Sequence, residues 1–299
     1  MDSNIFNDYY LHNTHSNLTN KINVVIGCGG TGSLFIRDAI RLQSVYNSDK
    51  ETEEMQTILI DGDLVETKNL KRQNFTPNDV GLNKAQVLAR RYSKSFNTNV
   101  SYIDKYIESS EGLYNTIKDI VDKKSGGMTV VYIYCFVDNV KTRLMMHNFV
   151  QLWRNITEPS FVYFIVDTGN TEYAGQLVLS SDCAQRVDGK TGKRGTLSET
   201  EHSPVDYLPD LADPANWDKF ASEMSCEEAA VSVPQTMAAN ATAANLALNT
   251  MYSILFDGEI DYHMVTFNVA KNSFRTFRSY CDDYDEIKYI ERIEYDGGE

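Results

Sequence analysis

The chain has 299 residues, of which 42% are hydrophobic and 23% are charged, an ordinary globular composition that excludes a disordered or fibrous protein. Its 42 acidic and 28 basic residues give a formal net charge of -14, which argues against a nucleic-acid or membrane partner, because such binding needs a basic face. No apolar stretch approaches the roughly 20 residues of a membrane span, no signal peptide is recognisable, and the five cysteines form no C-x-x-C pair, so we expect a reduced, cytoplasmic protein.

Apolar runs alternate with amphipathic segments along the first half of the chain. The predicted strands lie at 22–26, 57–60, 100–103, 129–137, 161–166 and 175–180, and the predicted helices at 33–46, from 83 onward, at 111–123 and at 140–154. This alternation predicts an α/β fold with a mostly parallel sheet and helices on both faces. The loops after the strands then gather at one edge of the sheet, where ligands bind.

The second half of the chain is less regular. Residues 181–224 are rich in Gly, Ser, Thr and Asp and predict a long surface loop, of the kind that is usually functional or disordered. An Ala-, Asn- and Leu-rich segment up to residue 255 predicts a tightly packed helix, and 262–269 with 273–278 predict a β-hairpin. The last segment, 282–299, has eight acids and two bases, and we expect a solvated acidic tail.

A glycine-rich turn, GCGGTG at 27–32, joins the first predicted strand to the first predicted helix. Glycines are needed where the backbone turns sharply and lets a phosphate approach the amides of a helix N-terminus. This context favours a nucleotide site over a merely structural turn. The expected binding residues of the turn are Gly27, Gly29, Gly30, Thr31 and Gly32, with Cys28 as a small filler among them.

A second constellation follows the second predicted strand, in IDGDLVETKNLKRQNF at 60–75. A dinucleotide-binding unit places one acid about 20 residues after the glycines, whereas Asp61 follows Gly27 by 34 positions. At the carboxyl end of a strand, Asp61 can hold both hydroxyls of a ribose. Arg72 is a permanently charged fork suited to a triphosphate, and because NADH has no triphosphate, this arginine favours ATP.

These residues resemble the ThiF/MoeB family, the adenylating domain that is shared with ubiquitin-activating enzymes. The resemblance rests on the pattern Asp-x-Asp-x-Val-x-x-x-Asn-Leu-x-Arg-Gln, which begins at residue 61, after the glycine turn. It implies a Rossmann-like fold. It also implies ATP-binding roles for Asp61, Asp63, Asn69, Arg72 and Gln73.

Two further motifs extend the resemblance. GLNKA at 81–85 resembles the family's Gly-x-x-Lys, whose lysine approaches the ATP phosphates, which implies this role for Lys84. Val137-Asp138-Asn139, followed by Arg143, is similar to the family's acid that holds magnesium at the end of a strand. One carboxylate plus ATP oxygens is a normal magnesium site, so the resemblance implies that Asp138 is the metal ligand.

The last motif, CEEAAVSVP at 226–234, resembles the family's Cys-x-x-x-Gly-Val-x-x-Pro, with Ala230 in place of the glycine. In some members this cysteine takes the activated carboxyl group as a thioester, which makes Cys226 a candidate catalytic nucleophile. The adjacent Glu227 and Glu228 disfavour the thiolate that this step needs. A structural role for Cys226 is the alternative.

The closer placement and the assembly rest on other features. DTGN at 167–170, followed by Gly175-Gln176, is reminiscent of the ThiF-like proteins of bacterial PRTRC systems. The zinc-binding C-x-x-C pairs that are common in MoeB and ThiF are absent, so we expect no structural zinc. The family's arginine ahead of the first strand, which reaches the ATP of a neighbouring subunit, has no clear counterpart, and this argues against a symmetric dimer with two sites. The resemblance implies a homodimer or a heterodimer.

Together, the resemblance implies an adenylyltransferase that uses ATP and Mg²⁺. The C-terminal carboxylate of a ubiquitin-like β-grasp protein or a peptide would attack the α-phosphorus and give an acyl-adenylate and pyrophosphate. Arg72, Lys84 and the magnesium at Asp138 would neutralise the developing charge. Two alternatives stay open, an NAD- or FAD-dependent oxidoreductase and a non-catalytic scaffold subunit; the intact set of ATP residues weighs against the scaffold.

The sequence predicts one domain with an insertion. Its expected parts are an N-terminal segment at 1–20, an ATP-binding Rossmann-like core at 21–180, a long crossover loop at 181–225, a helix and hairpin at 226–281 that complete the same domain, and an acidic tail at 282–299.

Overall fold

The computed structural model describes residues 9–10, 18–49, 54–124, 128–153, 155–156, 160–181, 185–187, 194–196, 205, 236–257, 259–260 and 262–278. The strands are β1 Tyr9–Tyr10, β2 Leu18–Ile26, β3 Glu54–Ile60, β4 Val100–Ile103, β5 Met128–Cys135, β6 Phe161–Asn170, β7 Ala174–Ser181, β8 Gln185–Val187, β9 Arg194–Thr196, β10 Glu259–Ile260, β11 Tyr262–Asn268 and β12 Ser273–Arg278. The α-helices are α1 Gly30–Asp49, α2 Lys84–Phe96, α3 Ser110–Val121, α4 Val140–Trp153 and α7 Met237–Tyr252. Short 3-10 helices at Thr67–Lys71 and Pro77–Asp79 lie within the polar segment before α2, and a π-helical turn, Ser253–Asp257, follows α7.

The main sheet has eight strands in the order β12-β11-β7-β6-β5-β2-β3-β4. From β6 to β4 all neighbouring strands are parallel. In chain order, these five strands follow the arrangement 3-2-1-4-5 of a doubly wound nucleotide-binding sheet. The chain leaves β2 toward one side and β5 toward the other, so the crevice between the carboxyl ends of β2 and β5 is the topological switch point. The predicted α/β, Rossmann-like fold is confirmed.

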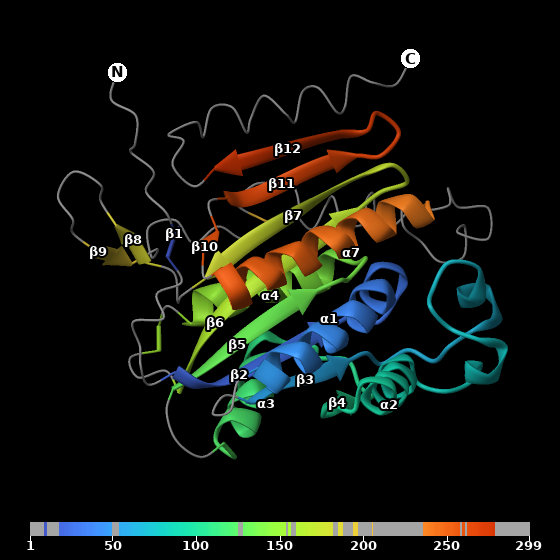
Figure 1. Cartoon of the computed structure of the whole chain (residues 1–299), viewed down its shortest axis with the longest axis horizontal. Coiled ribbons are helices and arrows are strands. Elements are labelled where there is room, and N and C mark those ends of the chain that lie inside the picture. Colours follow the sequence, from blue (N-terminus) through green and yellow to red (C-terminus); the bar gives the residue numbers. More distant parts are fainter. Residues whose placement is uncertain are drawn as a thin grey trace.

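The antiparallel part of the sheet adds β7, β11 and β12 beyond β6. Only three residues, 171–173, separate β6 from β7, which is too short for a crossover and allows only a hairpin. β11 and β12 form the predicted C-terminal hairpin, and β11 pairs with β7. Figure 1 shows this hairpin at the top of the view, at the end of the sheet opposite β4. A second small sheet, β10-β1-β8-β9, was not predicted.

Helices cover both faces of the parallel sheet, because its central strands β2, β3 and β5 carry apolar side chains on both sides. Val25, Leu59 and Tyr134 pack against α1, α2 and α7, whereas their neighbours Val24 and Ile58 pack against α3 and α4. The fully buried aliphatic side chains in these layers each contribute roughly 1.5–3 kcal/mol. In Figure 1, α1 and α7 lie side by side on the same face, and they contact each other along their length.

The helix that the sequence predicts behind the long loop is α7. Thr236 accepts a hydrogen bond from the amide of Ala239 and caps α7, which opens at Met237. Residues 226–235 and the tail at 282–299 lie outside the described residues. None of the helices in the described part of the chain is long and apolar enough to cross a bilayer.

Candidate functional site

The glycine turn sits at the switch point. The amide of Gly27 donates to the carbonyl of Ile60 at 3.0 Å, and the amide of Phe136 donates to the carbonyl of Ile26 at 2.8 Å, so the ends of β2, β3 and β5 are joined. Gly27 has a φ of 93°, and an added Cβ would lie 2.5 Å from the carbonyl oxygen of Phe136. Only glycine fits there. The turn leads directly into α1, whose first amides have no partner within the helix and are suited to an anion.

Asp61 ties the glycine turn to the end of β3. Its Oδ2 accepts from the amide of Cys28 at 2.6 Å, and its Oδ1 accepts from the amide of Asp63 at 2.8 Å. The residue is 8% exposed, and burial raises its pKa although both amides oppose the rise. The carboxylate of Asp61 therefore already accepts two backbone hydrogen bonds, which its predicted role as a ribose ligand did not include. Each carboxylate oxygen still has a second lone pair with which it can accept a hydroxyl.

A lysine–carboxylate pair stands beside Asp61. Lys84 is the first residue of α2, is 6% exposed, and its Nζ lies 2.7 Å from Oδ2 of Asp63. Burial raises the pKa of Asp63, but the hydrogen bonds from Lys84 and Tyr106 outweigh it, and the net shift is downward. The side chain of Asp63 is 47% exposed, so this pair reaches from the interior to the surface of the sheet edge.

Asn83 fixes the start of α2 and was not among the predicted site residues. Its Oδ1 accepts from the amide of Gln86 as the helix cap, and its Nδ2 donates to the carbonyls of Asp61 and Asp63 at 2.7 and 3.1 Å. An asparagine just before a predicted helix is a cap signal. The cap aligns Lys84 with the end of β3.

Asn69 and Arg72 belong to the first 3-10 helix and its end. Asn69 is buried, and its Oδ1 accepts from the amide of Glu66 at 2.8 Å, so in this structure its side chain holds the segment. Arg72 caps that helix with an exposed side chain. Within the described part of the chain, its guanidinium has no hydrogen-bond or ion-pair partner. Arg72 can therefore turn to an anion without breaking an interaction.

Gln73 reaches the glycine turn. Its Nε2 lies 3.9 Å from the place where a Cβ on Gly29 would be, and its Oε1 is buried without a hydrogen-bond partner. The next residue, Asn74, donates its amide to Oγ of Ser33 in α1 at 3.1 Å. Gln73 and Asn74 thus lie against the glycine turn and the first turn of α1.

The turn also contacts α7, which is far away in the sequence. Oγ1 of Thr31 donates to the side-chain oxygens of Asn170 and Asn240, and Nδ2 of Asn170 donates to Oδ1 of Asn240. Asn240 is fully buried, and its Nδ2 has no partner and faces Gly30. This amide cluster connects the end of β6, α7 and the glycine turn. Asn170 belongs to the DTGN motif, whereas no sequence motif pointed to Asn240.

Asp138 lies at the same edge of the sheet, in the loop between β5 and α4. Its side chain is exposed, and its negative charge raises the pKa of Tyr106, the residue that also contacts Asp63. The next residue, Asn139, caps α4 by accepting from the amide of Thr142 at 2.8 Å. Asp138 therefore shares the electrostatic surroundings of Asp61 and Asp63.

A buried ion pair holds the loop that carries Asp138. Nη1 of Arg143 lies 3.0 Å from Oδ1 of Asp167, and its Nη2 donates to the carbonyls of Val137 and Thr168. Burial raises the pKa of Asp167 to about 6, against the opposing charge of Arg143. Both terminal nitrogens of Arg143 thus bind inside the protein, and the bond to the carbonyl of Val137 anchors the residue next to Asp138.

The candidate nucleophile Cys226 lies outside the described residues. Cys28, inside the glycine turn, is fully buried, and burial, followed by the charge of Asp61, raises the pKa of its thiol. Such a thiol is a poor nucleophile.

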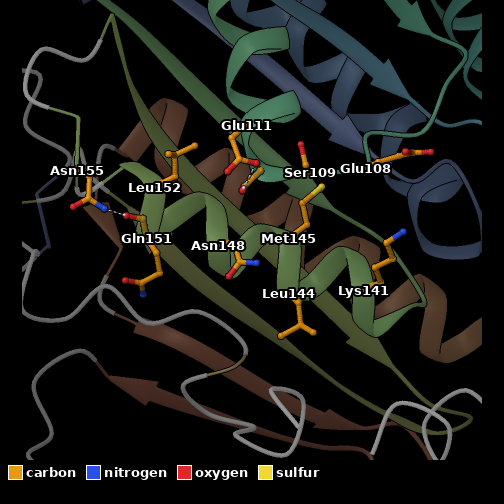
Figure 2. Close-up of a pocket in the computed structure, with 11 residues that line it drawn as sticks. Glu108, Ser109, Glu111, Lys141, Leu144, Met145, Asn148, Gln151, Leu152 and Asn155 are labelled. Atoms are coloured by element: carbon orange, nitrogen blue, oxygen red, sulfur yellow. Dashed lines mark hydrogen bonds between the residues drawn. The ribbon is translucent and has the colours of Figure 1, made fainter. Parts of the chain in front are cut away.

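A groove of about 620 Å³ lies between the N-terminal end of α3 and α4 (Figure 2). Its lining contains none of the residues predicted to bind ATP or metal. Glu108 follows Tyr106 by two residues in the chain, and Lys141 follows Asp138 by three. The residues that line it are Glu108, Ser109, Ser110, Glu111, Lys141, Leu144, Met145, Asn148, Gln151, Leu152 and Asn155.

The chain matches one protein family in sequence and resembles several solved structures in fold. A model of the ThiF family matches residues 7–283, whereas a search of curated proteins finds no match. Similar solved structures include PaaA (14% identity, 86% of this chain and 64% of that chain, TM-score 0.50) and the microcin C7 biosynthetic enzyme MccB with N-formylated MccA (20%, 90% and 68%, TM-score 0.52). E. coli MccB with ATP is also similar (19%, 90% and 68%, TM-score 0.50). The chain spans about two thirds of the length of these proteins, and the likeness concerns the fold.

The Arg143–Asp167 pair generates a stability prediction. Arg143→Leu leaves a buried carboxylate without its cation, which is expected to cost about 3–5 kcal/mol of unfolding free energy. Without the arginine, the pKa of Asp167 should rise further above about 6, because the opposing positive charge is lost. The folded variant then binds a proton that the unfolded chain does not, so its loss relative to the native chain should shrink as the pH falls from 8 to 5. Urea unfolding at both pH values measures this.

The double variant Arg143→Leu/Asp167→Asn serves as the matched control. It has no buried charge to neutralise, so its stability difference from the native chain at pH 8 should be smaller than that of Arg143→Leu. Equal losses for Arg143→Leu at pH 8 and pH 5 would contradict this assignment.

Proposed function

The chain belongs to the ThiF family, and from this premise we propose that it is an ATP-dependent adenylyltransferase. Its substrate would be the C-terminal carboxylate of a partner protein or peptide, and its products would be an acyl-adenylate and pyrophosphate. The observation that carries the proposal is the convergence at the switch point: the glycine turn, Asp61, the Asp63–Lys84 pair and Asp138 follow three neighbouring strands at one edge of the sheet.

The barrier to this reaction is electrostatic, because an anionic carboxylate must approach a polyanion. The amide of Gly29 and the first amides of α1, at Gly30 and Thr31, would cradle the triphosphate. The ammonium of Lys84 has three donors, of which Asp63 takes one, so the others are free for phosphate oxygens. Arg72 is unpaired in the described structure and would add its charge as the phosphates bind. No general base is needed, since a carboxylate is already ionised at neutral pH.

Asp138 has the chemistry of a magnesium ligand. It is an exposed carboxylate at the carboxyl end of β5, and Mg²⁺ is usually bound through one or two carboxylates and substrate phosphates rather than by a full protein cage. The described residues hold no group of three or more His, Cys, Asp or Glu placed for a metal, which agrees with a site that the nucleotide completes. A bound Mg²⁺ would offset charge on the phosphates.

The partner is proposed to be a ubiquitin-like β-grasp protein or a peptide. MccB, a structural neighbour, has been solved in complex with N-formylated MccA, a precedent for a partner bound to this fold. Assembly as a homodimer or a heterodimer, usual in the family, is part of the same proposal. A thioester on Cys226 would be a separate, later step, and the two adjacent glutamates argue against it.

Nucleotide selectivity separates this proposal from an oxidoreductase. ATP with Mg²⁺ should raise the melting temperature, since a ligand at 100 times its Kd stabilises the folded state by about 2.7 kcal/mol. NADH at the same concentration should leave it unchanged, because the triphosphate carries the interaction with Arg72 and Lys84. Differential scanning fluorimetry measures both. A shift with NADH and none with ATP would favour the oxidoreductase instead.

The role of Asp138 can be tested by isotope exchange between pyrophosphate and ATP. With a candidate β-grasp protein or peptide present, Asp138→Ala should lose exchange by about 100-fold or more, in line with the loss of one electrostatic group in an active site. Its melting temperature should stay close to that of the native chain, because the side chain is exposed. Asp119→Ala removes an exposed carboxylate from α3 and should retain exchange. A fully active Asp138→Ala would rule out the magnesium assignment.

Cys226 has a test of its own. Cys226→Ala should retain pyrophosphate exchange, because adenylation precedes any transfer to sulfur. Denaturing mass spectrometry of the native chain, with and without thiol, then shows whether a thioester forms. Loss of exchange in Cys226→Ala would mean that this residue supports the fold or the adenylation site.

A further inference from the structure

Tyr106 occupies the ligand edge of the sheet although no motif marks it. It lies in the loop between β4 and α3, and its side chain is 64% exposed. The ring lies against the backbone of Gly62, where an added Cβ would come within 2.7 Å of two ring carbons. A ring that is so exposed gains little free energy from burial. The contact of its hydroxyl group therefore explains the position of Tyr106 better than packing does.

The phenol makes a charge-assisted hydrogen bond. Its hydroxyl donates to Oδ1 of Asp63, while Oδ2 of the same carboxylate accepts from Nζ of Lys84 at 2.7 Å. The bond to Asp63 raises the pKa of Tyr106, and burial and the negative charges of Asp61 and Asp138 add to the rise. One carboxylate is thus held from two sides, by the loop after β4 and by the first turn of α2.

Resting on the function proposed above, we propose that Tyr106 is a positioning residue that fixes Lys84 for the ATP phosphates by holding Asp63. Lys84 is almost fully buried, so the direction of its ammonium depends on the position of the Asp63 carboxylate to which it donates. Asp63 is half-exposed and, with Lys84 as its only side-chain anchor, would be free to rotate into solvent. The phenol supplies the second anchor.

This arrangement leaves Lys84 available to a ligand. The ammonium of Lys84 has three donors. Asp63 accepts one of them, and because the phenol of Tyr106 holds Asp63 in place, the other two can reach phosphate oxygens. Charge-assisted hydrogen bonds of this kind are about twice as strong as neutral ones. Tyr106 therefore acts on the nucleotide through Asp63 and needs no contact with it.

The test measures the Kd of ATP with Mg²⁺ by isothermal titration calorimetry on the full-length chain. Tyr106→Phe keeps the ring and removes the hydroxyl, and it should weaken ATP binding by roughly three- to tenfold, as expected for one hydrogen bond to a charged group. In the Asp63→Ala background, the same substitution should have no further effect. Tyr102→Phe is the matched control: it removes a hydroxyl from β4 that accepts from Gln86 at 2.7 Å, and it should bind ATP as the native chain does.

Each outcome separates the two proposals. If the native chain does not bind ATP, the proposed function fails and the assignment of Tyr106 fails with it. If the native chain binds ATP and Tyr106→Phe binds equally well, only the positioning role is overturned. The positioning role is also overturned if Tyr106→Phe weakens binding as much in Asp63→Ala as in the native chain, because Tyr106 would then act independently of Asp63. Circular dichroism of Tyr106→Phe should match the native chain.

Discussion

The carboxylate of Asp61 is the contact on which the candidate site depends. By accepting the amides of Cys28 and Asp63, it joins the glycine turn after β2 to the segment after β3. That segment carries Asp63, whose carboxylate in turn directs Lys84. A charge-assisted bond from two backbone amides holds the turn in the shape that leaves the first amides of α1 open to an anion. Burial raises the pKa of this carboxylate, and the two amide hydrogen bonds oppose that rise while they hold the turn in place.

Some polar groups near the glycine turn are buried without a hydrogen-bond partner, and a charged pair is buried close to them. Nδ2 of Asn240 and Oε1 of Gln73 are buried without hydrogen bonds, and an unmet buried group costs about 1–3 kcal/mol. The Arg143–Asp167 pair lies under the loop of Asp138 and is a further expensive feature. These three costs lie beside the glycine turn and under the loop of Asp138, and functional sites are where such local costs are tolerated.

The sequence predicted the fold class and the edge of the sheet because both follow from alternation and from the direction of parallel strands. It could not predict that both oxygens of Asp61 are taken by amides, since this depends on the path of the loop rather than on the type of residue. Asn240 escaped notice because it meets Thr31 across 209 positions, a contact that exists only once α7 packs on α1. Tyr106 follows a predicted strand, and that position alone was its signal.

The most direct test of the convergence on one triphosphate is a crystal structure of the protein with Mg²⁺ and a non-hydrolysable ATP analogue. The account predicts the triphosphate on the amides of Gly29 to Thr31, Lys84 and Arg72 on phosphate oxygens, and the metal on Asp138. A nucleotide bound elsewhere, for example in the groove between α3 and α4, or one that leaves Lys84 and Arg72 without a phosphate contact, would contradict it.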